Sequence, residues 1–324
     1  MATVEMRPLL EAREYDPFRV LGLHRDGANW CVRVFNPHAH SIALECDGEH
    51  ISLRPAGNGG IFEWHCSEPP TQPWRLHVQE GKRSFRMHDP YAFPPAASEH
   101  DLYLFSSGSN YQAYRLLGAL TEIRQGVAGI CFRVWAPNAE RVSVIGDFNH
   151  WDGRCHPLAS LGASGVWELF VPELPAGTLY KFELRLRGSE VVKVKADPYA
   201  RAFEKRPATA ARVVAPAAYA WQDAAWLQRR AGTDWLHAPM SIYEVHPGSW
   251  MRHPDGSFYN YCDLADKLVP YLQQQSFTHV ELLPIMEHPL DESWGYQCTG
   301  FFAPSSRFGT PDDFRYFVDA CHQA

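Results

Sequence analysis

The sequence repeats itself once, and this repeat constrains the fold more than any other feature of the chain. Residues 31–39 (CVRVFNPHA) and 131–139 (CFRVWAPNA) align at an offset of 100 residues, with Cys, Arg, Val, Pro and Ala identical. Further along, residues 61–64 (IFEW) correspond to residues 166–169 (VWEL). Because self-similarity at a fixed spacing is the mark of a repeated structural unit, the first two thirds of the chain should hold two copies of one domain.

The sequence pattern of each copy predicts a set of short strands. Alternating apolar residues separated by Gly, Pro and Asn turns at about ten-residue spacing are typical of antiparallel β-sandwiches. Each copy also ends on the sequence Asp-Pro-Tyr-Ala, at residues 89–92 and 197–200. We therefore predict two related, immunoglobulin-like β-sandwiches, at residues 1–105 and 106–220.

The pattern changes after the second copy. Residues 221–238 are polar and contain three Trp, which indicates a connector packed on a neighbouring element. The predicted elements that follow are strands at 241–245 and 277–283 and helices over 261–275 and from Thr310 onward. The order strand–helix–strand–helix predicts a parallel sheet with right-handed crossovers in residues 239–324. Because two such units cannot close a sheet, we expect this domain to be truncated at Ala324.

Both predicted helices carry recognisable signals. Leu264, Leu268 and Leu272 recur every four residues, which gives the first helix one apolar face. The second begins at Thr310 with Thr-Pro-Asp-Asp: a hydroxyl N-cap, proline in the first turn and acidic side chains beside the helix N-terminus.

Composition excludes several classes of protein. A net charge of −7 without a run of Lys or Arg offers no electrostatic footprint for nucleic acid or an anionic membrane. No apolar signal region and no apolar run of about 18 residues is present, so we expect neither a signal peptide nor a membrane span. The eight Cys and sixteen His show no metal-binding spacing. We expect a cytoplasmic protein with reduced thiols, no cofactor and no metal.

Several segments together resemble a known family, the glycogen (1,4-α-glucan) branching enzymes. The segments that resemble the opening of the family's catalytic barrel are 242–250 (IYEVHPGSW), 264–271 (LADKLVPY), 277–284 (FTHVELLP), 293–297 (SWGYQ) and 307–317 (RFGTPDDFRYF). Residues 132–139 and 146–152 (GDFNHWD) resemble the starch-binding-type sandwich that precedes such barrels. The sequence departs from the family pattern at Cys298, where Pro is usual, and at Pro247, where an apolar residue is usual.

The resemblance implies a fold and a reaction. It implies two tandem sandwiches followed by the first two βα units of a TIM (β/α)₈ barrel of the amylase superfamily. The enzyme would cleave an α-1,4-glucan and transfer the segment to a 6-hydroxyl, forming an α-1,6 branch. This retaining chemistry uses two carboxylates about 5–5.5 Å apart. In the family these groups come from later barrel strands, so we assign no catalytic residue within residues 1–324 and expect this chain alone to be inactive.

Substrate contacts are nevertheless expected in the covered part of the barrel. Trp294, Tyr296 and Gln297 follow the second barrel strand, and the active face of a TIM barrel lies at the carboxyl ends of its strands. Aromatic rings pack on the C–H faces of sugars, and phenol or amide groups can bond the hydroxyls. The resemblance assigns Tyr296 to the sugar at the cleavage point. Core packing is the alternative for all three residues.

The second sandwich carries another set of candidates. Trp135, Phe148 and Trp151 could form a glucan-binding surface, the alternative being that they pack against the barrel. The partner that we expect is an α-glucan such as glycogen or an amylose-like chain.

Other functions remain open. A debranching enzyme or a trehalose-releasing hydrolase belongs to the same superfamily, and a non-catalytic glucan-binding protein would follow if the gene ended at residue 324. The acids Glu287, Asp291 and Glu292 follow the second strand and are most simply solvated loop residues. Glu244 and Glu281 lie within the predicted strands, where paired acids of a barrel interior are the simplest interpretation.

Overall fold

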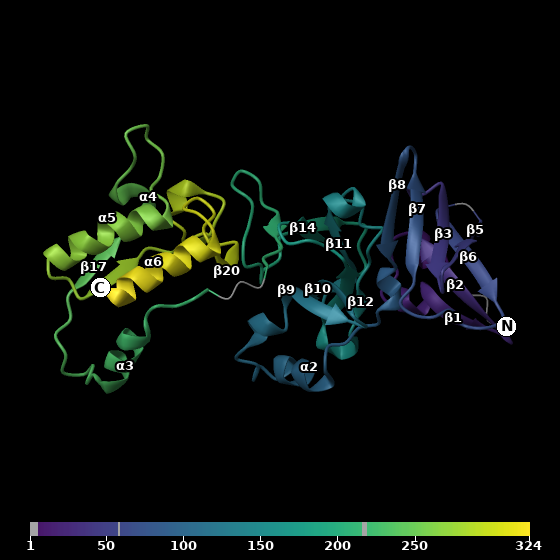
Figure 1. Cartoon of the computed structure of the whole chain (residues 1–324), viewed down its shortest axis with the longest axis horizontal. Coiled ribbons are helices and arrows are strands. Elements are labelled where there is room, and N and C mark those ends of the chain that lie inside the picture. Colours follow the sequence, from purple (N-terminus) through teal and green to yellow (C-terminus); the bar gives the residue numbers. More distant parts are fainter. Residues whose placement is uncertain (1–5, 58, 216–218) are drawn as a thin grey trace. The chain divides into compact units, whose positions relative to one another are not determined.

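The computed structural model describes residues 6–57, 59–215 and 219–324 (Figure 1). The chain divides into two compact units, residues 1–197 and 198–324. This division falls inside the segment predicted as the second sandwich, 106–220, and residues 216–218 near the end of that segment lie outside the described residues.

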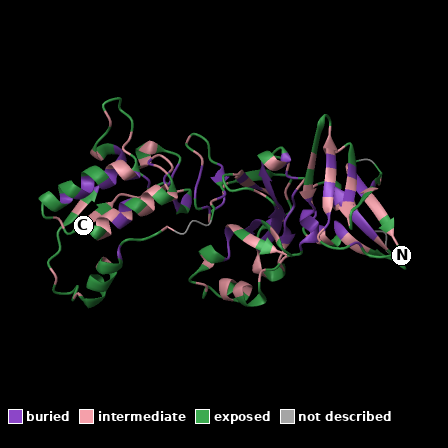
Figure 2. Cartoon of the chain, in the orientation of Figure 1, coloured by how far each residue is buried: buried purple, intermediate pink, exposed green. Residues whose placement is uncertain are grey.

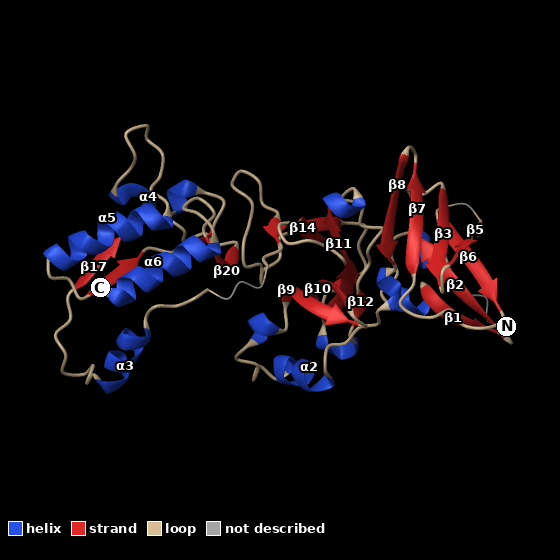
Figure 3. Ribbon diagram, in the orientation of Figure 1, coloured by secondary structure: helices blue, strands red, loops and turns tan. Residues whose placement is uncertain are grey.

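The first sandwich consists of two four-stranded antiparallel sheets (Figure 3). One sheet has the order β1 (Gly22–Asp26), β2 (Asn29–Phe35), β6 (Ile61–Cys66), β5 (Arg54–Pro55). The other has the order β4 (Glu49–Ser52), β3 (Ser41–Cys46), β7 (Arg75–Glu80), β8 (Arg83–His88). Val34 and Phe62 from one sheet share a buried cluster with Leu44 and Val78 from the other, so the two sheets pack face to face (Figure 2).

The second sandwich is built in the same way. Its first sheet has the order β12 (Ala159–Ser160), β13 (Val166–Pro172), β10 (Val127–Trp135), β9 (Gly118–Arg124). Its second sheet has the order β11 (Ala139–Gly146), β14 (Leu179–Leu186), β15 (Val192–Lys195). The Phe132 ring of β10 meets the Tyr180 ring of β14 edge to face at 4.9 Å, which places the apolar faces of the two sheets against each other. The predicted sandwich character is thus confirmed.

The internal repeat corresponds to equivalent strands. β2 and β10, which carry the two copies, each lie between two antiparallel neighbours. Phe35 pairs with Ile61 in the first sandwich, and Trp135 pairs with Val166 in the second. The residues that align in sequence therefore also occupy the same register positions.

The two sandwiches share apolar contacts, which explains why they form one unit. Phe93 lies 5.2 Å from Phe170, and both Phe170 and Cys131 of the second sandwich belong to the core cluster of the first. The Tyr91 hydroxyl donates to the Pro157 carbonyl at 3.2 Å. Short helical segments complete this unit: α1 (Arg7–Leu10), η1 (Pro17–Arg19), η2 (Pro90–Ala92), α2 (Glu99–Ser106), η3 (Ala113–Arg115), η4 (Asp147–Asn149) and η5 (Gly162–Ser164).

The second unit contains a parallel strand pair and two main helices. Its elements are β16 (Ala211–Arg212), α3 (Ala224–Gly232), β17 (Ile242–Val245), α4 (Pro247–Trp250), α5 (Tyr261–Gln274), β18 (His279–Leu282), β19 (Met286–Glu287), η6 (Asp291–Ser293), β20 (Gly300–Pro304) and α6 (Pro311–Gln323). β17 and β18 pair in parallel and α5 connects them, so the predicted strand–helix–strand unit is present. β19 and β20 form a separate antiparallel pair.

The helices begin where the sequence predicts. The Thr310 hydroxyl accepts from the Asp313 amide at 3.2 Å, and Pro311 is the first residue of α6. At the start of α5, the Asn260 side chain accepts from the Asp263 amide at 2.8 Å. The apolar face predicted from Leu264, Leu268 and Leu272 is buried in the core of this unit.

The segment before β17 packs against α6. The Trp226 ring stacks on the His322 ring with 3.6 Å between centroids and 6° between planes. His322 Nδ1 lies 2.8 Å from an Asp223 carboxylate oxygen. The Gln222 amide and the Tyr219 hydroxyl both donate to the buried Asp319 carboxylate, at 3.0 and 3.2 Å. The stretch around residue 221 is therefore packed against its own unit.

Candidate functional site

The turn after η6 brings three of the predicted residues together. Trp294 adopts a left-handed backbone with φ of 54°, and Gly295 follows with φ of 87°. A Cβ on Gly295 would lie 2.1 Å from the Pro284 carbonyl oxygen, so the turn requires glycine. The Tyr296 amide donates to the Ser293 carbonyl at 3.0 Å and closes the turn.

The side chains of this turn point outward. Trp294 is 56% exposed, Tyr296 is 69% exposed, and Gln297 is also exposed. The Trp294 ring lies roughly parallel to the His246 ring, with 6.0 Å between centroids and 30° between planes. Among the described residues, the Tyr296 hydroxyl has no hydrogen-bond partner. Within this unit, therefore, neither aromatic ring is a core residue.

A network of ion pairs holds the residues that lead into this turn. The Arg206 Nε donates to Asp291 at 2.5 Å, and the Arg307 Nε donates to the same oxygen at 2.6 Å. The hydrogen bond from Arg206, and to a lesser extent the one from Arg307, lowers the pKa of Asp291 to about 2. Arg307 also donates to Glu287 at 3.0 Å. The network fixes Asp291, the first residue of the helical turn that leads into Trp294.

One of the loop acids, Glu287, is therefore not the solvated residue that the sequence suggested, whereas the Asp291 side chain is 41% exposed. Glu287 is 5% exposed and also accepts from the Ser306 amide at 2.6 Å, and Asp291 is held by two arginines. Glu292 is exposed. Sequence spacing could not reveal this pairing, because Arg206 and Asp291 are 85 residues apart.

Glu244 and Glu281 lie directly opposite each other across β17 and β18. Both are exposed on the face of the strand pair that points away from α5, while Val245 on the other face is buried in the core. Strand alternation accounts for this division, since successive side chains point to opposite faces.

The candidates in the second sandwich are spread over separate places. Trp135 ends β10 and is 53% exposed, with its ring 6.1 Å from Phe105 of α2. Trp151 follows η4 and is 37% exposed, and its Nε1 donates to Asp147 at 2.7 Å. The two Trp lie beyond opposite ends of β11, and a strand of this length spans roughly 25 Å. They therefore do not form one stacking platform.

Phe148 faces inward. Its half-buried ring meets the His156 ring edge to face at 5.4 Å. Phe148 also lines a cavity of about 250 Å³ between the two sandwiches, together with His38, Glu80, Tyr91 and His150. Its surroundings differ from the open surface expected of a ring that stacks on a polysaccharide.

All eight cysteines are free thiols. Among the described residues, no helix has the length and apolar character needed to cross a membrane.

Two family models match the chain. Residues 2–91 match the model of the alpha-1,4-glucan branching enzyme GlgB, N-terminal domain. Residues 116–200 match carbohydrate-binding module 48 (isoamylase N-terminal domain). The two matches cover the two sandwiches, and each model describes one copy of the internal repeat.

Curated relatives extend the match to nearly the whole chain. The 1,4-alpha-glucan branching enzyme GlgB of Nitrosospira multiformis is 52% identical over 98% of this chain, and that of Methylobacillus flagellatus is 54% identical over 98%. The chain spans only 43% and 44% of the length of these two relatives.

A solved structure is also similar. A protein from Salmonella typhimurium, described as a candidate alpha amylase and solved at 1.4 Å, matches 64% of this chain and 31% of its own length, with 29% identity and a TM-score of 0.50. Together with the two family models and the curated relatives, this likeness leads to one conclusion. Residues 1–324 match the amino-terminal portion of the 1,4-alpha-glucan branching enzymes.

Proposed function

We propose that residues 1–324 are part of a 1,4-α-glucan branching enzyme, which cleaves an α-1,4-linked glucan and transfers the segment to a 6-hydroxyl. The observation that carries this proposal is the 52% identity to a branching enzyme over 98% of the chain. Its substrate and partner is an α-glucan such as glycogen or an amylose-like chain. The reaction retains the anomeric configuration through a covalent glycosyl-enzyme, which needs two carboxylates about 5–5.5 Å apart.

We infer that the second unit begins a (β/α)₈ barrel. The parallel pair β17–β18 with α5 between the strands supports this inference. So does the uncovered face of the pair, where Ile242 is 49% exposed beside Glu244 and Glu281. Parallel sheets are normally covered on both faces, so further strands would close over these side chains. The catalytic carboxylates would lie on such strands, and residues 1–324 alone would be inactive.

Tyr296, with Trp294 and Gln297, is the substrate contact that we propose for this part of the enzyme. The turn follows β18, and active sites of (β/α)₈ enzymes lie at the carboxyl ends of the strands. Two exposed rings, one with an unpartnered hydroxyl, suit a ligand with apolar C–H faces and many hydroxyls. The ion pairs of Asp291 with Arg206 and Arg307 would hold the turn in place.

Glucan binding by the second sandwich is a further part of the proposal. The match to a carbohydrate-binding module supports it, and Trp135 and Trp151 are its exposed rings. Phe148 is the weakest of the three candidates, because its ring lines the cavity between the sandwiches. We also propose a cytoplasmic location, which the eight free thiols support.

A hybrid enzyme tests the proposed function. Residues 1–324 would replace the matching part of the Nitrosospira multiformis branching enzyme, and the hybrid would be incubated with amylose. We expect new α-1,6 linkages and a fall in iodine staining, while residues 1–324 alone produce neither. Release of reducing sugar without branches would instead favour a debranching or trehalose-releasing hydrolase. Branching by residues 1–324 alone would contradict the inference about where the chemistry lies.

A further inference from the structure

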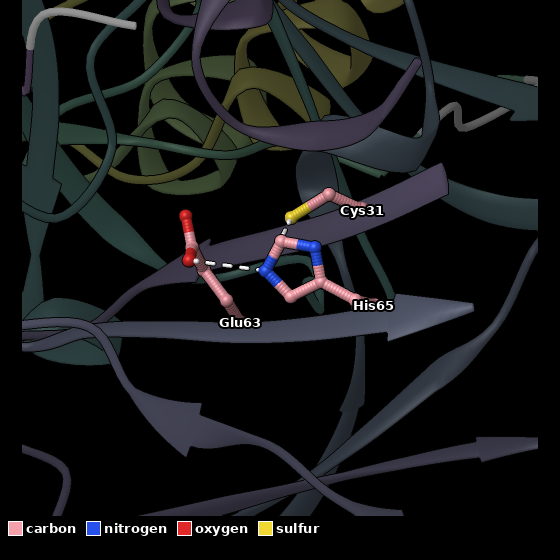
Figure 4. A group of neighbouring side chains, drawn as sticks. All are labelled: Cys31, Glu63 and His65. Atoms are coloured by element: carbon pink, nitrogen blue, oxygen red, sulfur yellow. Dashed lines mark hydrogen bonds and ion pairs between the residues drawn. The ribbon is translucent and has the colours of Figure 1, made fainter. Parts of the chain in front are cut away.

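The outer face of the first sandwich gathers three potential metal ligands from two neighbouring strands (Figure 4). Cys31 of β2 and His65 of β6 are direct cross-strand partners, so their side chains project from the same face. Glu63 lies two residues before His65 and shares that face. The Cys31 sulfur is 3.9 Å from His65 Nε2, and Glu63 Oε2 is 3.5 Å from the same nitrogen.

These separations are close to those of a bound transition metal. All three ligand atoms lie within 4.8 Å of one another. Zinc bonds of about 2.3 Å to sulfur and about 2.0–2.1 Å to nitrogen or oxygen, arranged tetrahedrally, place ligand atoms about 3.3–3.6 Å apart. Small side-chain movements would therefore bring the three atoms onto one ion.

Neighbouring residues orient two of the three ligands. An Asp26 carboxylate oxygen lies 3.2 Å from His65 Nδ1, the ring nitrogen that faces away from Cys31. A carboxylate on the remote nitrogen of a metal-binding histidine fixes the tautomer with the lone pair on the other nitrogen. Arg33 donates from Nε to Glu63 Oε1 at 2.5 Å, which leaves Glu63 Oε2 for a metal.

The charges also balance for a divalent ion. A Cys31 thiolate, Glu63 and Asp26 would contribute −3, and Arg33 with a divalent metal would contribute +3. Cys31 is 1% exposed and forms the floor of the group, whereas the His65 side chain is 53% exposed and borders solvent. An ion could therefore enter from the solvent side while the thiolate stays shielded.

The second copy of the repeat provides an internal comparison. Cys131 occupies the position of Cys31, but its cross-strand partner is Phe170 instead of a histidine. Arg124 donates to the Cys131 sulfur at 3.1 Å, and in the first copy Arg33 makes a longer contact with the Cys31 sulfur, at 3.9 Å. The cysteine is thus common to both copies, and His65 is what distinguishes the first copy.

Two other groups of potential metal ligands are less suited to binding a metal ion. In the group of His38, Asp152 and Cys155, Arg154 donates to both oxygens of Asp152. In the group of Glu45, His50 and His77, Arg86 and His77 each engage one oxygen of Glu45. Among the groups found in the described residues, only the one on β2 and β6 has both of two features. One of its carboxylate oxygens forms no bond with an arginine, and its histidine is oriented by a second carboxylate.

We propose that Cys31, His65 and Glu63 bind a divalent transition metal of the zinc type, with water as the fourth ligand. One thiolate, one imidazole and one carboxylate form a borderline-soft set that suits Zn²⁺ and excludes Mg²⁺ and Ca²⁺, which take oxygen ligands. The site is independent of the proposed branching activity, since it lies on a sandwich and involves no barrel residue.

The test uses residues 1–324, purified reduced and free of metal and then titrated with Co²⁺ as the probe. We expect one equivalent of Co²⁺ to produce a thiolate-to-cobalt charge-transfer band that excess Zn²⁺ removes. Cys31→Ser should abolish the band, and Asp26→Asn should weaken binding about 10- to 100-fold. Cys66→Ser is the matched control, because the Cys66 sulfur donates to the Trp30 carbonyl and lies outside the group.

Several outcomes would overturn the proposal. They are the absence of a charge-transfer band in the unaltered chain, a band that survives Cys31→Ser, and a band lost in Cys155→Ser but not in Cys31→Ser. Circular dichroism checks that each variant is folded. If Cys31→Ser fails to fold, His65→Gln and Asp26→Asn decide the matter, because both side chains are about half exposed and unchanged Co²⁺ affinity in both would refute the site.

Discussion

Arg133 donates from Nε to Glu168 at 2.8 Å, across the central strand pair of the second sandwich. Arg33 and Glu63 form the corresponding pair in the first sandwich. In each sandwich the arginine and glutamate are direct cross-strand partners, and they belong to the segments that align in the repeat. The second glutamate is fully buried and also accepts from Arg124 at 2.6 Å and from the Ala96 amide at 2.8 Å.

The first prediction concerns this buried glutamate. Glu168→Gln should lower the free energy of unfolding of the first unit by about 3–5 kcal/mol, because two arginines would lose their buried counter-charge. Glu122→Gln is the matched control: its side chain also pairs with Arg124 and Arg133 but is 25% exposed. That change should cost only about 1 kcal/mol. Urea unfolding measures both values, and equal losses would contradict the assigned role of Glu168.

A second prediction concerns pH. Burial lowers the pKa of His156 to about 4, from the ordinary histidine value of about 6.5. The neutral ring therefore stabilises the fold fully above pH 6.5, and this contribution is lost as the pH falls through 4. The loss should reach about 3 kcal/mol for a shift of this size. The Asn149 side-chain amide lies 2.9 Å from His156 Nδ1, and the Gln of His156→Gln can also accept from this amide but does not titrate.

The measurement is urea unfolding of the unaltered chain and His156→Gln at pH 7 and at pH 4.5. Other groups titrate in both proteins, so the difference between the two pH dependences isolates His156. An equal loss of stability in both proteins would show that His156 is not the group responsible.

A third prediction concerns Gly295. Gly295→Ala should disturb the turn for two reasons, a positive φ of 87° and a Cβ 2.1 Å from the Pro284 carbonyl oxygen. Gly256→Ala is the matched control, since its φ is 83° and a Cβ there meets nothing within 4 Å. The control should cost about 1–2 kcal/mol from the backbone alone. Gly295→Ala should cost a further 1–3 kcal/mol or so from steric overlap. Equal melting temperatures for the two variants would contradict the close approach.

A fourth prediction concerns Tyr296 in the hybrid enzyme. If its hydroxyl bonds a sugar hydroxyl in the transition state, Tyr296→Phe should lose about 0.5–1.5 kcal/mol, or roughly a 2- to 13-fold lower rate. Tyr296→Ala should lose more, because the stacking surface is also removed. Neither change should alter the melting temperature much, since the side chain is 69% exposed in this unit.

Tyr111→Ala serves as the control for Tyr296, because Tyr111 is 92% exposed and lies in the first unit. Full turnover in Tyr296→Phe, combined with a marked fall in melting temperature for Tyr296→Ala, would indicate a packing role instead.

Features that depend on local sequence were predictable. Alternation and the repeat identified the central strands, and the Thr-Pro-Asp-Asp sequence located the start of α6 to the residue. The exposed position of Tyr296 next to Gly295 agrees with the expected loop, although its role as a sugar contact stays a prediction.

Features that depend on pairing between distant segments were not predictable. Cys31 and His65 lie 34 residues apart and meet only through the register of β2 with β6, which no spacing motif encodes. The buried Glu287 accepts a hydrogen bond from Arg307, 20 residues later. The buried Asp319 accepts one from a backbone amide 97 residues earlier. Two Trp that looked like one surface in sequence, Trp135 and Trp151, are separated by the length of β11.

The attachment of Tyr219, Gln222 and Trp226 to α6 has a consequence for synthesis of the chain on the ribosome. Tyr219 is made 100 residues before its partner Asp319. At about 5–20 residues per second, translation of that interval takes roughly 5–20 s. Until His322 is made, the Trp226 indole lacks the ring that stacks on it in the finished fold, so a nascent chain at this stage leaves this aromatic side chain without its packing partner.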